Sequence, residues 1–185
     1  MGSGPALAVV GPDAAGSHRS AAVIHELDLL GGPQPGTVTV TRPLGGSGSN
    51  TARPGIRLHI AALPAAHATT RRAVPVTSVA RTVVDLARTS SFRAGVVAAD
   101  SALRAGQVSK AELHSLITAC GRWPGIQRAR RVVAFSDARS ESVFESISRV
   151  AFDEQGLPPP DLQVWVGGEV DVVGRLPVDR LPDYW

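Results

Sequence analysis

The stretch Pro75-Val-Thr-Ser-Val-Ala-Arg-Thr-Val-Val-Asp-Leu-Ala87 passes from an extended pattern into a helical one. Its first three residues favour a short extended segment, because proline and β-branched residues disfavour helix. Ser78 is a good N-cap. The apolar residues after it recur at helical spacing, at Val79, Val83, Leu86 and Ala87. Arg81, Asp85 and Arg88 are expected on the other face of this helix. A strand that leads directly into an amphipathic helix indicates a mixed α/β chain.

Two further strands are expected on the N-terminal side of this stretch. Residues 37–41 and 56–60 alternate between β-branched or apolar and polar side chains, and we expect them to pair. The loop between them is rich in glycine and serine. Earlier in the chain, Ser17 can cap a helix that runs to about Leu30.

Helical patterns dominate the chain after the opening stretch. They cover about residues 93–105, 109–119, 127–135 and 140–155. Two of these helices begin with a capping-box pattern, Ser109 with Glu112 and Ser142 with Glu145. Residues 162–166 and 169–173 alternate again and predict a hairpin joined by two glycines. The element pattern as a whole predicts the α/β (α+β) fold class.

Composition limits the possible functions. The chain has 185 residues, a formal net charge of +3 and a pI near 10.0, and Lys110 is its only lysine. An arginine-based positive charge favours phosphate or carboxylate partners, and a GC-rich genome explains the same bias. Cys120 is the only cysteine, which excludes a disulfide framework or a cysteine metal site within one chain. No segment has the pattern of a signal peptide or a membrane span, so we expect a cytoplasmic protein without a membrane partner.

Four stretches together resemble a bacterial family. They are residues 17–22 (Ser-His-Arg-Ser-Ala-Ala), the opening stretch 75–87, residues 99–106 (Ala-Asp-Ser-Ala-Leu-Arg-Ala-Gly), and residues 141–149 with Gly156, Gln163 and Asp171. In order and spacing they resemble proteins of high-GC bacteria that join an AbiEi-type antitoxin module to a C-terminal endonuclease-like domain. That domain is related to the very-short-patch-repair nucleases, which have the restriction-endonuclease fold.

The resemblance implies three segments. Residues 1–16 would be a flexible N-terminal remnant, residues 17–135 the AbiEi-antitoxin-like module, and residues 136–185 a truncated endonuclease-like domain. Such proteins usually carry a winged helix-turn-helix before the Ser17 stretch, and little sequence precedes it here. They also continue past the aspartate into a Glu-x-Asp-like strand, which the residues after Asp171 do not match.

Glu145 and Asp171 are the candidate catalytic and metal-binding residues. A glutamate on a helix and an aspartate on a strand supply the hard oxygen ligands that Mg²⁺ prefers, and Mg²⁺ can activate water for phosphodiester cleavage. Two other roles compete for Glu145. It lies at i, i+4 spacing between Glu141 and Arg149, which would form an ion-pair row, and it can complete the capping box with Ser142.

The candidate nucleic-acid-binding residues are four arginines close in sequence, Arg122, Arg128, Arg130 and Arg131. Phosphate contact is the functional interpretation of this cluster, and a solvated helix face is the alternative. His18 and His25 are seven residues apart, which suits packing better than a metal site.

The sequence therefore predicts an antitoxin-like, DNA-associated protein of a bacterial toxin–antitoxin or defence family that is not catalytic as it stands. A cognate toxin is the expected protein partner, DNA is a second expected partner, and no cofactor is required. The resemblance implies a toxin of the nucleotidyltransferase type. The alternative function is a Mg²⁺-dependent DNA endonuclease that uses Glu145 and Asp171.

Overall fold

The computed structural model describes residues 10–47 and 54–162, and its centre is a five-stranded mixed sheet. In chain order the strands are β1 (Ala15–Gly16), β2 (Val38–Arg42), β3 (Ile56–Ile60), β4 (Ala68–Arg71) and β5 (Val74–Thr77). Their order across the sheet is β3-β2-β1-β5-β4. The mixed α/β class expected from the sequence is confirmed.

The sheet combines parallel and antiparallel pairs. β2 and β3 run parallel from Val38 opposite Ile56 onward, so the two strands that were expected to pair do so. β1 lies between β2, to which it is antiparallel, and β5, to which it is parallel. β4 and β5 form an antiparallel hairpin at the other edge. The very short β1 therefore occupies the centre of the sheet, and its residues lie within the segment 1–16 that we expected to be flexible.

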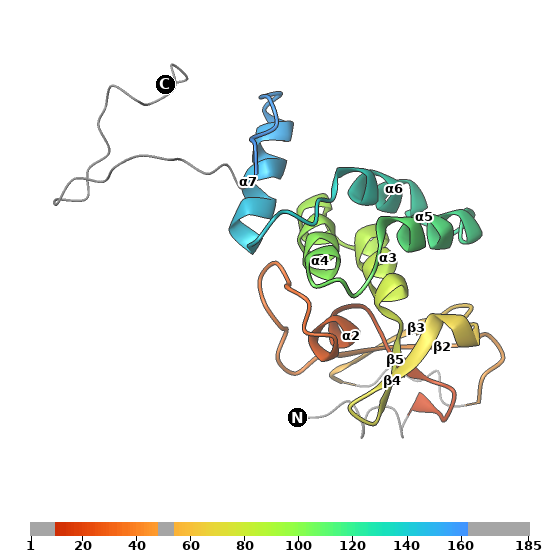
Figure 1. Ribbon diagram of the computed structural model, residues 1–185. Coiled ribbons are helices and arrows are strands. Elements are labelled where there is room, and N and C mark those ends of the chain that lie inside the picture. Colours follow the sequence, from red (N-terminus) through yellow and green to blue (C-terminus); the bar gives the residue numbers. More distant parts are fainter. Residues whose placement is uncertain (1–9, 48–53, 163–185) are drawn as a thin grey trace, which may run out of the picture.

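The helices gather on one side of the sheet (Figure 1). Their bounds are α2 (His18–Ile24), α3 (Val79–Thr89), α4 (Phe92–Arg104), α5 (Lys110–Ala119), α6 (Ile126–Phe135) and α7 (Val143–Glu154). A short 3₁₀ helix, η1 (Ala65–His67), precedes β4. α7 packs against α4 and lies far from the sheet. Within the described residues, no helix is long and apolar enough to cross a membrane.

The first helix is shorter than the sequence predicted. α2 ends at Ile24 rather than near Leu30, because the chain turns at Glu26, which has a left-handed φ of 62°. Leu27 is still buried in the core, although it lies outside the helix. The expected hairpin over residues 162–173 lies almost wholly outside the described residues.

Two apolar clusters stabilise the fold. The larger is helical and joins buried residues of α2, α3, α4, α5, α6 and α7, among them Val83, Val96, Leu113 and Val132. The smaller centres on Val10, Ala14 and Val40 at the sheet. Aromatic residues contribute little to either cluster, so dense packing of small aliphatic side chains supplies most of the apolar burial.

Two glycines permit close approach between helices. A Cβ on Gly95 of α4 would lie 2.9 Å from Val132 Cγ2 of α6 and 3.1 Å from the Ala87 Cα of α3. Gly125 has a φ of 78°, and a Cβ there would lie 2.4 Å from the Arg88 carbonyl oxygen. Both contacts need a residue without a side chain, so these glycines fix how α3, α4 and α6 meet.

Helix capping follows the sequence only in part. Ser109 and Glu112 form the complete capping box that was predicted at α5. At α7 the Ser142 side chain accepts a hydrogen bond from the Glu145 backbone. The Glu145 carboxylate accepts a hydrogen bond from the backbone N–H of Glu141, at 2.9 Å. In the predicted capping box this hydrogen bond would come from the backbone N–H of Ser142.

Candidate functional site

The predicted carboxylate pair can be placed only in part. Glu145 is half-buried in the first turn of α7 and accepts from the Glu141 backbone, whereas Asp171 lies outside the described residues. Among the described residues, no group of three or more histidines, cysteines, aspartates and glutamates is arranged to hold a metal ion. Metal binding by Glu145 and Asp171 therefore stays a prediction.

Arg149, the third member of the expected ion-pair row, points into the protein. Its Nη1 donates to Asp100 Oδ2 at 2.9 Å and its Nη2 donates to the Phe135 carbonyl oxygen at 2.6 Å. Asp100 is fully buried on α4 and also accepts from the Asp137 backbone and from Ser146 Oγ. Burial raises the pKa of Asp100, while these donors oppose the shift. The Asp100 cluster thus ties α7 to the helical core by polar contacts.

The four candidate arginines are all exposed, on α6 and the turn before it. Arg128 donates to the carbonyl oxygens of Ser90 and Arg88, at 3.0 and 3.4 Å, which satisfies the C-terminal end of α3. The Arg131 guanidinium lies 5.0 Å from the Phe92 ring centroid. Two members of the cluster thus also have structural contacts. Phosphate binding by Arg122, Arg128, Arg130 and Arg131 stays a prediction.

A buried ion network was not foreseen. Arg81 and Asp85 on α3 have no exposed surface, and Arg81 Nε donates to Asp85 Oδ2 at 2.8 Å. Arg88 Nε donates to the other carboxylate oxygen, also at 2.8 Å. The sequence pattern predicted these residues on the face of α3 opposite its apolar stripe. In the structure this second face is also buried. The sheet loops and the turn before α6 enclose α3 from the side that the sequence pattern left open.

Aromatic rings and a loop carbonyl complete the Arg81 environment. The Arg81 guanidinium lies 4.3 Å from the Trp123 ring centroid, and its Nη1 donates to the Ala62 carbonyl oxygen at 2.9 Å. His67 meets Trp123 edge-on and lies 3.4 Å from Arg81 Nη1. A charged group enclosed in this way is stabilised by its carboxylate partner and by the ring face.

His18 and His59 form a second polar feature next to this network. Their rings stack with centroids 4.1 Å apart, and His18 Nδ1 lies 3.0 Å from Ser17 Oγ. Burial lowers the pKa of His18 to about 4, and Asp85 only partly offsets that effect. Burial is also the largest cause of the lowered pKa of His59. Both rings are therefore neutral at physiological pH and act as packing groups, as the sequence suggested for His18.

The sequence signals for the buried network of Arg81, Asp85 and Arg88 were present but ambiguous. Arg81, Asp85 and Arg88 have the i, i+4 and i, i+3 spacing of helix ion pairs, which exposed helices share. Nothing local marks Trp123 as the partner of Arg81, since the two lie on different elements. The network could be found only after the contacts between elements were known.

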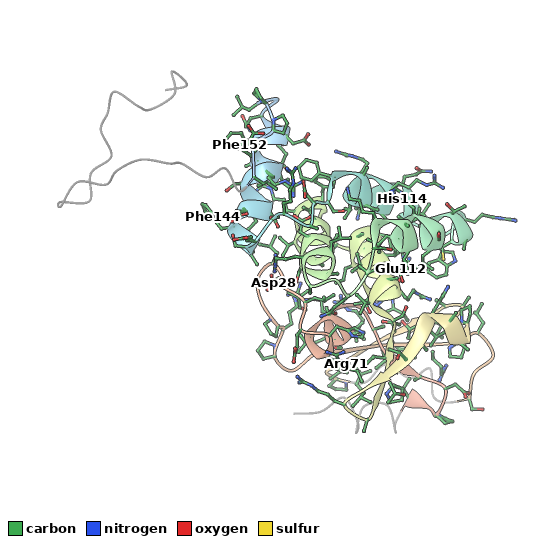
Figure 2. All side chains as sticks on the ribbon, in the orientation of Figure 1. Asp28, Arg71, Glu112, His114, Phe144 and Phe152 are labelled. Atoms are coloured by element: carbon green, nitrogen blue, oxygen red, sulfur yellow. The ribbon has the colours of Figure 1, made fainter. Side chains whose placement is uncertain are left out.

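A groove lies between β4 and α5, with a volume of about 800 Å³. We call it the β4–α5 groove. The ends of η1 and α3 and the loop before α5 contribute to its walls, and Figure 2 labels Arg71 and Glu112 on its two sides. Residues that line it include His25, His67, Thr70, Arg71, Gln107, Ala111, Glu112, Ser115, Leu116 and Ala119. Its volume falls within the usual range of small-molecule pockets.

The mixed sheet, its helical layer and the buried α3 network define a small α+β domain over most of the described chain. Residues 14–135 match the family model described as the AbiEi antitoxin C-terminal domain, and the chain belongs to this family. The match begins one residue before β1 and ends at the last residue of α6.

Two curated relatives come from Mycobacterium tuberculosis. The protein named "Uncharacterized protein Rv2248" is 33% identical over 100 residues, which make up 54% of this chain and 37% of the relative. "Uncharacterized protein MT2308", from another strain, gives the same values. The matched region thus spans little more than a third of each relative.

Proposed function

We propose that this protein acts as an antitoxin in a bacterial toxin–antitoxin or defence system, by binding and without catalysis. The observation that supports this most strongly is the family match over residues 14–135, which covers every strand of the sheet and the helices α2 to α6. The family description makes a toxin partner the natural expectation. The resemblance seen in the sequence implies a toxin of the nucleotidyltransferase type.

The arrangement of charged groups supports a binding role. Asp85 and Asp100, the two fully buried carboxylates in the described part of the chain, each accept charge-assisted hydrogen bonds from arginine. These acids serve the packing of α3 and α7, and burial removes them from contact with a substrate. Surface groups such as those of the β4–α5 groove are better placed to contact another protein.

Growth rescue tests this proposal. The intact protein is co-expressed in turn with each candidate toxin encoded at its own locus, and growth is compared with an empty vector. We expect relief of growth arrest with one of these toxins. Val83→Asp is a matched loss-of-fold control, because it places a carboxylate at a fully buried core position. No relief by the folded protein with any toxin of the locus would contradict the antitoxin function.

DNA contact is a second part of the proposal and is tested separately. The exposed arginines Arg122 and Arg130 would contribute non-specific phosphate contacts. We expect replacement of both by glutamine to weaken binding to a DNA duplex and to reduce its salt dependence. No binding by the parent protein at low salt would contradict DNA contact, and unchanged binding by the double variant would exclude Arg122 and Arg130 as the contact residues.

A further inference from the structure

The β4–α5 groove combines a strand edge with a helix face of small residues. β4 is the outermost strand of the sheet among the described residues. The hairpin closes through Arg72 and Ala73, so the pair Arg71–Val74 exchanges hydrogen bonds and the next pair, Thr70–Pro75, does not. The backbone N–H and C=O of Thr70 consequently point away from β5, toward the open edge.

The opposite wall of the groove leaves room for a chain. Ala111, Ser115 and Ala119 follow one another at i, i+4, i+8 along α5, line the groove and are exposed. β4 has four residues and α5 has ten, which correspond to lengths of about 13 and 15 Å. The two walls are therefore of similar length, about that of a strand of four or five residues.

Two residues that line the groove each carry a buried hydrogen-bond acceptor without a partner among the described residues. The His25 side chain is 98% buried, and its Nε2 lies 2.8 Å from the Thr77 carbonyl oxygen, so Nε2 carries the proton. Burial lowers the pKa of His25, which keeps the ring neutral and leaves Nδ1 as an acceptor. Gln107 donates through Nε2 to the His25 carbonyl oxygen at 3.1 Å. Neither His25 Nδ1 nor Gln107 Oε1 has a hydrogen-bond partner among the described residues.

We propose that the β4–α5 groove binds an extended peptide segment of a partner protein, which adds a strand to β4 and presents an N–H donor side chain to His25 and Gln107. The backbone of the segment pairs with Thr70, and its side chains lie over Ala111, Ser115 and Ala119. Asparagine, glutamine or arginine supplies the donors that the two acceptors lack. Buried acceptors without partners cost free energy, so a matching donor favours binding.

This inference deepens the proposed function, because it names the surface through which the antitoxin would contact its toxin. The main variant is Ser115→Tyr, which fills the groove from an exposed helix position. His114→Tyr is the matched control, since His114 is the neighbouring residue on α5, is also exposed and does not line the groove (Figure 2). Ala111→Tyr is a second groove variant in case Ser115→Tyr disturbs folding.

A synthetic peptide tests the groove without any toxin. The probe is the capped heptapeptide Thr-Val-Thr-Asn-Thr-Val-Thr, compared with a version that has leucine in place of asparagine. Binding to the intact protein is followed by backbone amide shifts in NMR. We expect shifts at Thr70 and along α5, binding about tenfold weaker for the leucine peptide, and a similar loss in Ser115→Tyr but not in His114→Tyr. Absence of binding, or binding that Ser115→Tyr and Ala111→Tyr leave unchanged, would overturn the inference.

Growth rescue then separates the two proposals. If the parent protein and His114→Tyr relieve toxin arrest and the two groove variants do not, both proposals are supported. If the folded groove variants also relieve arrest, the groove is not the toxin surface, while the antitoxin function stands. If the parent protein relieves the growth arrest caused by none of the toxins but binds the peptide as described, the antitoxin function is contradicted. Peptide binding by the β4–α5 groove is then still supported.

Discussion

Arg81 and Asp85 show how single residues connect the two layers of this protein. Their ion pair is fully buried, so loss of either partner would leave an uncompensated charge in the interior. Arg81 also reaches the Ala62 carbonyl and the face of Trp123, which ties α3 to a sheet loop and to the turn before α6. Local sequence could not reveal this role, because the same spacing describes an exposed helix pair.

His18 makes stability depend on pH at the residue scale. Its pKa is lowered from 6.5 to about 4 in the folded protein, mainly by burial. Between these values the unfolded chain binds a proton that the folded chain does not, so stability is complete above about pH 6.5 and is lost as the pH falls toward 4. The loss attributable to His18 is up to about 3 kcal/mol.

Urea unfolding at pH about 7 and about 5 measures this effect. His18→Asn is the informative variant, because asparagine is neutral throughout and tolerates the left-handed φ of 49° at this position. We expect a smaller pH dependence in this variant than in the parent. His114→Asn, on the exposed side of α5, should keep the full dependence. Equal slopes in the parent and His18→Asn would show that His18 is not the group responsible.

The β4–β5 hairpin holds two non-glycine residues in left-handed backbone. Arg72 and Ala73 have φ values of 51° and 59°, as a type I′ turn requires at both positions. We expect Ala73→Gly to stabilise the protein by about 0.5 kcal/mol, because glycine removes the Cβ clash at the cost of more freedom in the unfolded chain. Ala68→Gly in the extended part of β4 should destabilise instead. Thermal unfolding of both variants checks the opposite signs.

At the scale of elements, α7 contacts the core through polar residues as well as through an apolar one. Ser146 and Arg149 contact Asp100 on α4, whereas Phe144 is 78% exposed and lies on the side of α7 away from the other helices (Figure 2). Val150 is the buried apolar residue of this helix. Polar contacts with Asp100 and the burial of Val150 therefore hold α7 in place together.

Asp100→Ala should release α7 more than any other element. Removing the carboxylate leaves the donors of Asp137, Ser146 and Arg149 without their acceptor, and we expect a loss of about 3 kcal/mol. Hydrogen exchange should accelerate most over residues 143–154, since α7 depends on this cluster. Asp153→Ala, at an exposed position on α7, is the control and should leave exchange in the helix nearly unchanged. Uniform acceleration over all helices would contradict a local role.

Elements differ in how well the sequence predicted them. The helices α3 to α7 were anticipated within a few residues, because each has an apolar stripe and a recognisable cap or stop. β2 and β3 were anticipated from their alternation. β1 was missed, since two small residues show no periodicity, and β4 was missed because Ala68–Arg71 is largely exposed and has no buried face to mark it.

At the scale of the whole molecule, tertiary packing extends beyond the region that matches the family model. The family match stops at the end of α6, while Asp137, Ser146 and Arg149 beyond it converge on Asp100 within the matched region. The first helix of the expected endonuclease-like segment thus packs on the antitoxin-family domain. Whether residues 136–185 form a nuclease-like unit stays a prediction from the sequence.

A plasmid assay tests the nuclease alternative. We expect the folded protein with Mg²⁺ or Mn²⁺ to leave supercoiled DNA intact, because the function proposed for it is binding without catalysis. Nicking that depends on the metal and disappears in Asp171→Asn would contradict this expectation and favour the endonuclease. Nicking that survives in that variant would indicate a contaminating enzyme.

The sequence by itself determined the elements whose signals are local. Apolar periodicity, N-cap serines and stop glycines define the helices, and short motifs in a fixed order indicated the AbiEi resemblance that the family match supports. Only the tertiary structure decided which polar residues are buried together. Arg81, Asp85 and Trp123 meet, and Asp100 meets Arg149, because separate elements pack. Burial and pairing of charges depend on distances across the fold, which no local pattern encodes.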